Sequence, residues 1–463
     1  MFEVNILDES GLQNLLCSKE DHFSDIKSKD IKPAKLQESF VAFANADGGE
    51  LYVGIEDEKY NGNRIRPFIN PEEANAIINV LLEETNPTVE GIGVEYLQIE
   101  AGFILHISIP KSPKVHYTSS GDCYIRLNAN KNKIKGDRIT SLAYSKGIMA
   151  YERQPVANAD IAEILDSRIL AEYIQRVSTN LAPEKFLKKQ RLISRKSNDN
   201  NSEVPNVGCV ILFDEEPQAT LDTRCAIKVY RLLTTDSEYK REHLLEMPTT
   251  INGSLEILIS NAIKEVKRYL DGAKLYDGSR MEYPAEAIKE VLVNAVIHRD
   301  YSLNDDIHIK IYDDRIEVIS PGKLPGYMTL SNLYEERFSR NPNLVRMLHN
   351  LPEPLNHDIG EGLDTVKNEL RKAGLVEPQF EEKENSFIVT MKHKRLASIE
   401  SVIIEYLTQN PDKSITNLLV RQLTGENDVN KIKGVLKRLR NQNKICVIGN
   451  PSSAFEYEYK LVD

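Results

Sequence analysis

The 463 residues of the chain suffice for about three domains of roughly 150 residues each, and no apolar run approaches the ~18 residues of a membrane helix. The 59 basic and 70 acidic side chains give a net charge of −11, so the protein is not a general polyanion binder and any nucleic-acid surface must be local. The five cysteines form no CxxC pair or Cys/His cluster, so neither a disulfide framework nor a zinc site is indicated. Without a signal-peptide pattern, a cytoplasmic protein with no membrane partner is expected.

The first 150 residues alternate helix-like and strand-like segments, which predicts an α/β domain. Apolar residues at helical spacing predict helices at 35–46 and 72–84. Shorter apolar runs predict strands at 51–55, 103–109 and 122–127, and an Asp-Gly-Gly turn at 47–49 joins the first helix to the first strand.

Two motifs of this region have a family resemblance. One is Glu20-x4-Asp25-Ile-Lys27, and the other is FVAFANADGGELYVGIED at residues 40–57, which places acidic residues at the end of a strand. Both resemble the Schlafen AlbA-like domain, whose usual motifs are E-x4-E-F-K, AFANTxGG and G-V-x-D. The strand that contains Tyr124-Ile-Arg126 fits the same family. Asp25 departs from the usual Glu and is shorter by one methylene.

The resemblance implies that Glu20, Asp25 and Asp57 form an acidic site. In Schlafen-type nucleases such a trio binds a divalent metal and cuts RNA. A metal held there, Mg²⁺ or Mn²⁺, would activate water and neutralise the charge that develops on a phosphodiester, and Lys27 would steady a phosphate. The alternative stays open, because charged residues at the ends of strands and helices are usually solvated surface.

The middle of the chain is expected to be a scaffold without chemistry of its own. A helix is predicted at 160–178 and a short docking turn at 185–193. The Asn/Ser-rich stretch at 196–203 is expected to be an exposed loop. Two strands at 208–213 and 226–232 and a helix at 255–270 follow.

A polar stripe marks the next predicted helix, which Pro284 opens. Nearly every position from 287 to 297 is apolar, so the helix should be buried. Glu290, Asn294 and His298 stand at i, i+4 and i+8 and therefore share one side of the helix. Buried polar groups are costly without partners. Two interpretations are open: the stripe faces a ligand or metal, or it belongs to a structural network with a neighbouring helix.

Glycine-bearing loops follow the stripe. A hairpin is predicted from strands at 307–312 and 315–319, and the loop Ser320–Gly326 comes directly after it. The turn Gly360-Glu361-Gly362-Leu363 runs into a helix at 364–373, and such a turn presents free N–H groups to a phosphate. A strand at 387–391 closes this region.

Four strings in this order, EVLVNAVIHRDYS, IEVISPGKLPG, SRNPNL and IGEGLDTV, resemble the GHKL ATPases, and more closely a divergent branch in bacterial RecG-like regulators. The resemblance, with the Schlafen-like part, covers roughly residues 10 to 395. It implies an ATP-binding α/β sandwich. Glu290 would orient or deprotonate the attacking water, and Asn294 would hold Mg²⁺ through its amide oxygen. The other implied nucleotide-site residues are Gly322 in the first loop, Gly360, Glu361, Gly362 and Leu363 as the phosphate lid, Thr390 near the base, and His298 and Arg299 at the end of the helix.

One position departs from the wider superfamily. An acidic residue there accepts the amine of adenine just before the first glycine loop, whereas this chain has Ser320-Pro321. Base selectivity and ATP hydrolysis are therefore left open by the resemblance.

The last 66 residues are expected to form a winged helix. Helices are predicted at 399–409, 415–423 and 429–440, and a two-stranded wing at 444–448 and 455–461. The third helix is locally basic, as a DNA recognition helix must be, through Lys431, Lys433, Lys437, Arg438 and Arg440. The alternative is a winged helix that docks a protein.

The predicted architecture is a multidomain α/β (α+β) chain. It has a Schlafen AlbA-like domain (1–150), a linking segment (151–280), a GHKL-like domain (281–395) and a winged helix (396–463). Two function classes remain: a metal-dependent nuclease gated by ATP, as in phage defence, or an ATP-responsive DNA-binding regulator. By analogy with both families we expect a homo-oligomer.

Overall fold

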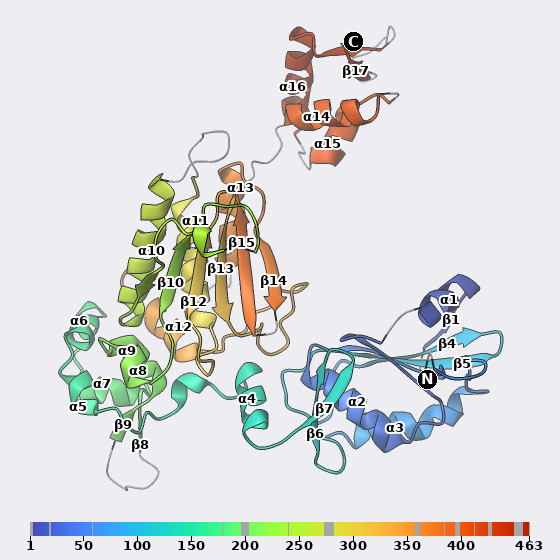
Figure 1. Ribbon diagram of the computed structural model, residues 1–463, viewed down its shortest axis with the longest axis horizontal. Helices are drawn as coiled ribbons and strands as arrows, with labels where there is room; N and C mark the ends of the chain where they lie inside the picture. The colour runs from blue at the N-terminus through green and yellow to red at the C-terminus, as the bar shows by residue number, and fades with distance from the viewer. Residues whose placement is uncertain are drawn as a thin grey trace. The chain divides into compact units, whose positions relative to one another are not determined.

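The computed structural model divides the protein into two compact units (Figure 1). The first comprises Met1–Lys367 with Pro378–Met391, and the second comprises Asn368–Glu377 with Lys392–Asp463. Helices and several open sheets share the chain, so the expected multidomain α/β fold is confirmed. The structure describes residues 3–17, 20–57, 59–177, 179–195, 203–238, 240–272, 282–356, 362–383, 385–393, 399–411, 413–424, 428–448 and 457–462.

A five-stranded sheet organises the N-terminal part of the first unit, in the order β1-β4-β5-β3-β2. Its strands are β1 (Glu3–Ile6), β2 (Ser24–Lys27), β3 (Gly49–Val53), β4 (Gly93–Ile99) and β5 (Gly102–Ile109). The edge strands β1 and β2 run parallel to their neighbours, and the central pairs are antiparallel. The predicted strands at 51–55 and 103–109 are therefore confirmed; the first lies two residues earlier at both ends, and the second begins one residue earlier.

Helices cover both faces of this sheet. They are α1 (Glu9–Cys17), α2 (Pro33–Asn45), the 3-10 turn η1 (Pro71–Ala74) and α3 (Asn75–Glu83). Phe40, Val41 and Phe43 of α2 are fully buried in the core that α2 and α3 share with one face. The other face packs beneath α1. The helix predicted at 72–84 begins as the η1 turn, because Asn70 caps that turn by accepting from the Glu73 N–H at 3.2 Å.

A β-hairpin of β6 (Cys123–Leu127) and β7 (Asn130–Ile134) packs on α2 and is followed by α4 (Asp137–Ser145). The strand predicted at 122–127 is thus confirmed. Cys123 and Ile134 are buried in a small core with Leu142 of α4. The hairpin also places the Arg126 guanidinium in contact with the Asp25 carboxylate of β2.

The middle segment corrects two predictions. It contains η2 (Tyr151–Arg153), α5 (Ile161–Leu165), α6 (Arg168–Arg176), α7 (Pro183–Lys189), β8 (Ile193–Arg195), β9 (Glu203–Pro205), α8 (Val207–Phe213) and α9 (Pro217–Thr220). The single helix expected at 160–178 is two helices, because Ser167 caps α6 by accepting from the Ile169 N–H at 3.2 Å. The docking turn expected at 185–193 is largely the helix α7, and residues 196–202 of the expected loop lie outside the described residues.

The strand expected at 208–213 is wrong, because these residues form the helix α8. All seven of its residues are buried, and a continuous short apolar run fits a buried helix as well as a buried strand. Asn206 decides between them locally: its side chain accepts from the Cys209 N–H at 2.9 Å and caps the helix.

A six-stranded sheet organises the C-terminal part of the first unit, with its strands in the order β11-β10-β12-β13-β15-β14. Its strands are β10 (Ile227–Arg231), β11 (Thr249–Ile251), β12 (Ile307–Ile311), β13 (Arg315–Pro321), β14 (Gln379–Lys383) and β15 (Ser386–Lys392). The antiparallel hairpin of β12 and β13 confirms the predicted pairing around residues 313–314. β12 also pairs in parallel with β10, so the hairpin lies inside the sheet.

Two long helices pack against this sheet, α10 (Leu255–Gly272) and α11 (Ala285–His298), as Figure 1 shows. Val291, Val293 and Val296 of α11 are essentially fully buried, as the apolar run predicts. The 3-10 turn η3 (Arg241–His243) precedes β11, and the helices α12 (Pro342–His349) and α13 (Gly362–Lys372) follow the hairpin. None of the described helices is long and apolar enough to cross a membrane.

The second unit contains three helices and a two-stranded antiparallel sheet. They are α14 (Ile399–Gln409), α15 (Asn417–Thr424), α16 (Val429–Asn441), β16 (Ile445–Val447) and β17 (Tyr459–Leu461). Ile403, Ile432 and Leu436 are buried in their common core. The elements lie where the sequence predicts them, and their assignment as a winged helix stays a prediction.

Candidate functional sites

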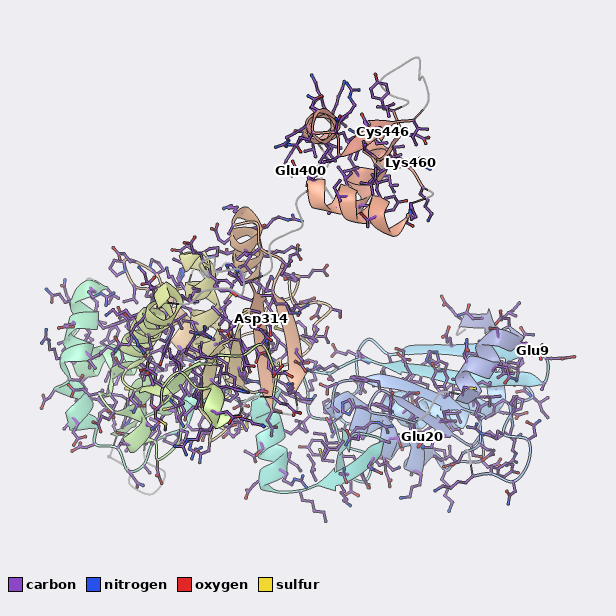
Figure 2. All side chains as sticks on the ribbon, turned by 45° about the horizontal axis from the view of Figure 1, so that its top comes forward. Glu9, Glu20, Asp314, Glu400, Cys446 and Lys460 are labelled. Carbon is purple, nitrogen blue, oxygen red and sulfur yellow. The ribbon has the colours of Figure 1, made fainter. Side chains whose placement is uncertain are left out.

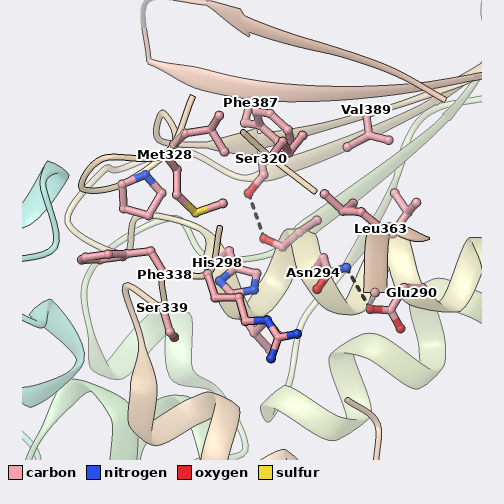
Figure 3. Close-up of a pocket in the computed structure, with 18 of the residues that line it drawn as sticks. Glu290, Asn294, His298, Ser320, Met328, Phe338, Ser339, Leu363, Phe387 and Val389 are labelled. Atoms are coloured by element: carbon pink, nitrogen blue, oxygen red, sulfur yellow. Dashed lines mark hydrogen bonds between the residues drawn. The ribbon is translucent and has the colours of Figure 1, made fainter. Parts of the chain in front are cut away.

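A cavity of about 380 Å³ lies beside α11 (Figure 3). Its wall is formed by the polar side of α11, by β13 and β15, by the loop after β13 and by the start of α13. The side chains that face it include Glu290, Asn294, His298, Ser320, Met328, Phe338, Ser339, Leu363, Phe387 and Val389. The polar stripe therefore faces a hollow.

Glu290 and Asn294 are in contact in the wall of this cavity. The Asn294 amide nitrogen donates to a Glu290 carboxylate oxygen at 2.9 Å, as the i,i+4 spacing on one helix allows. Gly362, the first residue of α13, lies directly against this pair. A Cβ at position 362 would overlap the Glu290 carboxylate and would come within 3.0 Å of the Asn294 amide nitrogen. A side chain at position 362 would therefore displace the Glu290 carboxylate from its place beside α13.

His298, the third residue of the stripe, lines the cavity as a neutral imidazole. Burial and the positive charge of Arg340 lower the pKa of His298 to about 4. The Arg340 guanidinium, which is 1% exposed, also donates to the His298 carbonyl oxygen at 3.2 Å. At neutral pH His298 can therefore offer a hydrogen bond to a ligand without adding charge.

The wall of the cavity also contains apolar side chains and unpaired polar atoms. Met328, Phe387 and Val389 supply its apolar wall. The Ser339 hydroxyl and the Asn356 side-chain oxygen have no hydrogen-bond partner among the residues that the structure describes, and Asn356 is only 4% exposed. Because buried polar atoms are normally paired, these two atoms can form hydrogen bonds with a ligand or with water.

Ser320 lies in the cavity wall, at the position where the resemblance would predict an acidic residue. Its hydroxyl donates to the Ala295 carbonyl oxygen of α11 at 2.8 Å. The oxygen atom therefore remains as a hydrogen-bond acceptor towards the cavity.

Two residues expected at the nucleotide site do not line the cavity. Thr390 lies on β15 next to Val389, and alternate side chains of a strand point to opposite faces, so only Val389 reaches the cavity. The Arg299 guanidinium turns away, donating to the Asp305 carbonyl oxygen at 2.7 Å and lying over the Tyr301 ring. Its role in the fold is to hold the loop that follows α11.

The remaining predicted nucleotide-site residues divide into two groups. Gly322 and Leu363 line the cavity. Gly322 has a φ of +103°, and a Cβ there would come within 2.5 Å of the Arg340 guanidinium, so glycine is required. Gly360 and Glu361 lie outside the described residues.

In the N-terminal module, Lys27 brings two of the three predicted acidic residues together. Its ammonium lies 3.1 Å from the Glu20 carboxylate and also contacts Asp25. Asp25 is 2% exposed and receives a second cation, the Arg126 guanidinium, at 3.3 Å. Partial burial and the neighbouring Asp25 carboxylate raise the pKa of Glu20.

Arg126 holds the segment around Asp25 in place, a role that the sequence analysis did not assign to it. It is 1% exposed and donates to the carbonyl oxygens of Asp21, at 2.6 Å, and Ser24, at 2.9 Å. Its guanidinium also lies 4.2 Å from the centre of the Phe43 ring. An arginine at an inward position of a predicted strand is the signal that could have marked it, because buried arginine needs partners.

Asp57 is not part of the Glu20–Asp25 group. It is exposed and accepts from the Lys59 N–H at 3.0 Å, whereas the preceding Glu56 is buried and binds Ser28 and Arg66. Within the described part of the chain, no group of three or more His, Cys, Asp or Glu side chains is placed to hold a metal ion. The structure therefore does not assemble the expected three-carboxylate metal site.

The predicted basic face of α16 lies at the surface. Its five basic residues, Lys431, Lys433, Lys437, Arg438 and Arg440, are all exposed, whereas the apolar side of α16 packs in the core. Arg438 pairs with Glu400 of α14, which Figure 2 labels, at 3.0 Å. The helix thus presents a positive surface on an acidic chain.

Comparison with known proteins identifies both predicted modules. Residues 20–135 match the family described as "Schlafen, AlbA_2", and residues 304–391 match "Putative ATP-dependent DNA helicase recG C-terminal". The chain joins a Schlafen AlbA_2 module to a RecG-like ATPase module. The predicted fusion is thereby confirmed. Glu290 and Asn294 precede the matched part of the ATPase module.

Other comparisons add little. A search of curated proteins finds no match. The chain is similar to the crystal structure of the DIP2311 protein from Corynebacterium diphtheriae, with 17% identity and a TM-score of 0.40, over 98% of this chain and 83% of that one. The two matched modules support ATP binding and an association with nucleic acid.

Proposed function

We propose that the protein binds ATP with Mg²⁺ in the cavity beside α11 and that the bound nucleotide regulates how the chain binds nucleic acid. The observation that supports this most strongly is the Glu290–Asn294 pair, which lines a cavity of about 380 Å³ against Gly362. Cavities of roughly 300–1,000 Å³ are usual for small ligands and cofactors.

The residues present fit a nucleotide. The apolar wall at Met328 and Phe387 suits the faces of a purine base, and the unpaired Ser339 and Asn356 atoms supply polar partners beside it. Ser320 accepts hydrogen bonds, as the missing acidic residue would. At the other end, the N-terminus of the 11-residue helix α13 meets the polar stripe and favours phosphate.

Each residue of the stripe has a defined task in this proposal. Because its amide nitrogen is committed to Glu290, Asn294 has its oxygen left to bind Mg²⁺. Mg²⁺ supplies the charge that neutralises the phosphates. Glu290 orients a water molecule, and the neutral His298 offers a hydrogen bond.

A thermal-shift titration tests the proposal. Mg-ATP should raise the melting temperature of the wild-type protein, because a ligand that binds only the folded state stabilises it. Asn294→Ala should abolish the shift. Asn79→Ala is a matched control, since Asn79 is exposed on helix α3 of the other module and should leave the shift unchanged. A flat titration in the wild type would refute nucleotide binding.

The basic face of α16 favours DNA binding, which makes an ATP-responsive regulator the function that the geometry supports best. Binding to random duplex DNA should weaken as salt rises, because phosphate contacts release counter-ions. Lys437→Glu with Arg440→Glu should remove that binding, whereas Lys240→Glu, an exposed change outside α16, should not. Absent or salt-insensitive binding would point to a protein partner.

Metal-dependent cleavage of RNA or single-stranded nucleic acid is the second candidate. The observation in its favour is that Glu20 and Asp25 meet on Lys27 in the Schlafen AlbA_2 module. A cleavage panel with Mg²⁺ or Mn²⁺, with and without EDTA, tests it, and Glu20→Gln, which changes one of the two carboxylates that meet on Lys27, should abolish any cleavage. Substrate that stays intact with both metals and with ATP present would exclude nuclease activity. It would also exclude a role in phage defence that depends on cleavage. Homo-oligomerisation stays a prediction that a mass measurement with and without ATP checks.

A further inference from the structure

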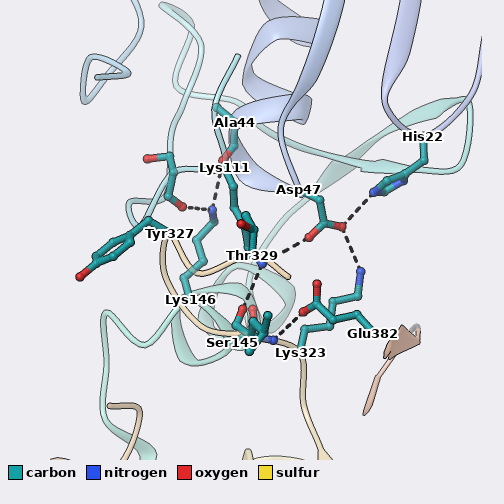
Figure 4. A network of polar contacts seen from close by, with 12 residues as sticks. His22, Ala44, Asp47, Lys111, Ser145, Lys146, Lys323, Tyr327, Thr329 and Glu382 are labelled. Atoms are coloured by element: carbon teal, nitrogen blue, oxygen red, sulfur yellow. Dashed lines mark hydrogen bonds and ion pairs between the residues drawn. The ribbon is translucent and has the colours of Figure 1, made fainter. Parts of the chain in front are cut away.

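The two modules of the first unit meet at a junction centred on Asp47 (Figure 4). Asp47 lies in the turn that links α2 to β3. Its carboxylate lies 3.0 Å from the ammonium of Lys323, 3.4 Å from that of Lys111 and 2.9 Å from the His22 ring. Lys323 comes from the ATPase module, and the other two come from the AlbA_2 module. One carboxylate is therefore shared between the modules.

The main chain next to Lys323 is held by both modules as well. Lys111 donates to the Leu324 carbonyl oxygen at 3.0 Å, and the Leu324 N–H donates to Glu382 at 2.6 Å. The Arg340 guanidinium donates to the Lys323 carbonyl oxygen at 2.7 Å and to that of Ser145, in α4, at 3.0 Å. The loop after β13 is thus fixed at several points around Lys323.

The same loop forms part of the cavity wall. Lys323 and Leu324 both line the cavity. So does Phe338, whose ring lies so close to Gly147 that a Cβ at 147 would overlap it. A ligand in the cavity therefore touches residues that are in direct contact with the AlbA_2 module.

On its other side the junction reaches the acidic group. His22, which binds Asp47, belongs to the short segment between Glu20 and Asp25. Arg126 fixes the same segment through backbone carbonyls. A line of contacts therefore runs from the cavity through Lys323, Asp47 and His22 to the segment between Glu20 and Asp25.

The charges at the junction make Lys323 the partner that a nucleotide can remove. Burial alone would raise the pKa of Asp47, but His22, Lys111 and Lys323 hold it well below its usual range, so the carboxylate is charged. The Lys111 side chain is 8% exposed and is tied to Leu324, whereas the Lys323 side chain is 36% exposed. Of the three cations around Asp47, Lys323 is also the one that lines the cavity.

We propose that a nucleotide bound in the cavity draws Lys323 and its loop away from Asp47, so that nucleotide binding lowers the affinity of the AlbA_2 module for nucleic acid. Loss of Lys323 leaves Asp47 less compensated beside His22, which adds negative potential where a polyanion would bind. The inference rests on the proposed nucleotide site. By linkage, nucleic acid must weaken nucleotide binding by the same factor.

Binding measurements on the full chain test this coupling in both directions. The probes are a labelled single-stranded RNA oligonucleotide and a non-hydrolysable ATP analogue with Mg²⁺. In the wild type the nucleotide should weaken RNA binding by about five-fold or more, and RNA should weaken nucleotide binding equally. Asp47→Asn and Lys323→Gln should each bring the factor close to one, and the double variant should change it no further.

A matched control separates the junction from general charge effects. Glu90→Gln removes a carboxylate of the same module that pairs with Lys114 at 2.6 Å on the surface, and it should keep the wild-type coupling. Should Asp47→Asn fail to fold, Lys323→Gln gives the same test from the other module. Coupling that persists in both variants, or an RNA complex that tightens with nucleotide, overturns the inference.

The outcomes also separate this inference from the proposed function. A wild-type protein that binds nucleotide and RNA independently refutes the junction and leaves the proposed function intact. A wild-type protein that binds no nucleotide refutes both.

Discussion

The two candidate sites differ in how the fold brings their residues together. Glu290 and Asn294 stand on one helix, and their side chains are hydrogen-bonded in the wall of a cavity. The predicted acidic residues of the AlbA_2 module come from separate segments. Only Glu20 and Asp25 meet there, and Asp57 is exposed without joining them.

The difference shows what a motif specifies. A spacing of four residues on a helix fixes the relative position of two side chains before any tertiary packing exists. Convergence of three segments instead depends on how each strand ends and on which neighbour each carboxylate binds. The Glu290–Asn294 site can therefore be tested directly for ligand binding. For the acidic residues of the AlbA_2 module, the contribution of each carboxylate to the stability of the fold has to be measured first.

The largest effect is expected from Gly362→Ala. A Cβ at this position would overlap the Glu290 carboxylate and crowd Asn294, so the Glu290 side chain would have to leave its place beside Asn294. Nucleotide binding should be lost, which isothermal titration with Mg-ATP measures. Gly434→Ala is the matched control: Gly434 lies in α16 with nothing near its added Cβ, and alanine there should stabilise the protein by up to about 1 kcal/mol.

Retained nucleotide affinity in Gly362→Ala would show that the close approach of α13 to the stripe is not part of the binding site. The spacing of Glu290 and Asn294 on one helix would then not identify the nucleotide-binding site, and the contrast between the two candidate sites would no longer hold.

A smaller effect, on stability, separates the two carboxylates of the other site. Asp25→Asn leaves Arg126 buried without its counter-ion and weakens the hold on Lys27, so it should cost about 3 kcal/mol. Asp57→Asn changes an exposed side chain and should stay within about 0.5 kcal/mol. Urea denaturation measures both. Equal costs would mean that the burial of Asp25 does not distinguish it from Asp57.

Much of the fold follows from local sequence patterns. The apolar run of α11, the β12–β13 hairpin and the Gly-Gly turn before β3 each fix their own geometry, and the structure agrees with them. The α8 segment shows the limit, because its short apolar run fits a strand or a helix, and the cap at Asn206 settles the choice. Where the spacing of apolar residues fits both a helix and a strand, contacts of the flanking residues decide which one forms.

The candidate sites show the same limit at the level of single residues. Arg299 continues the helix that ends at His298, yet its guanidinium turns to backbone carbonyls because a buried charge requires partners. Thr390 is one residue beyond Val389 and therefore on the other face of its strand. Asp47 and Lys323 are 276 positions apart in the sequence, so no local pattern could predict their contact.

The smallest effect is a pH dependence that belongs to the third residue of the stripe. The pKa of His298 is lowered to about 4, below the ~6.5 of an exposed histidine. Between these values the unfolded chain binds a proton that the folded chain does not. Stability from the neutral His298 is therefore complete above about pH 6.5 and is lost as the pH falls towards 4.

Urea midpoints measured from pH 7 to pH 5 test this sign. The wild type should lose more stability over this range than His298→Gln, whose amide does not titrate. His349→Gln, on the exposed side of α12, should keep the wild-type slope. Identical slopes in all three proteins would mean that His298 is as well solvated in the folded chain as in the unfolded one. The stripe would then end at Asn294, and the cavity would be polar along only two turns of α11.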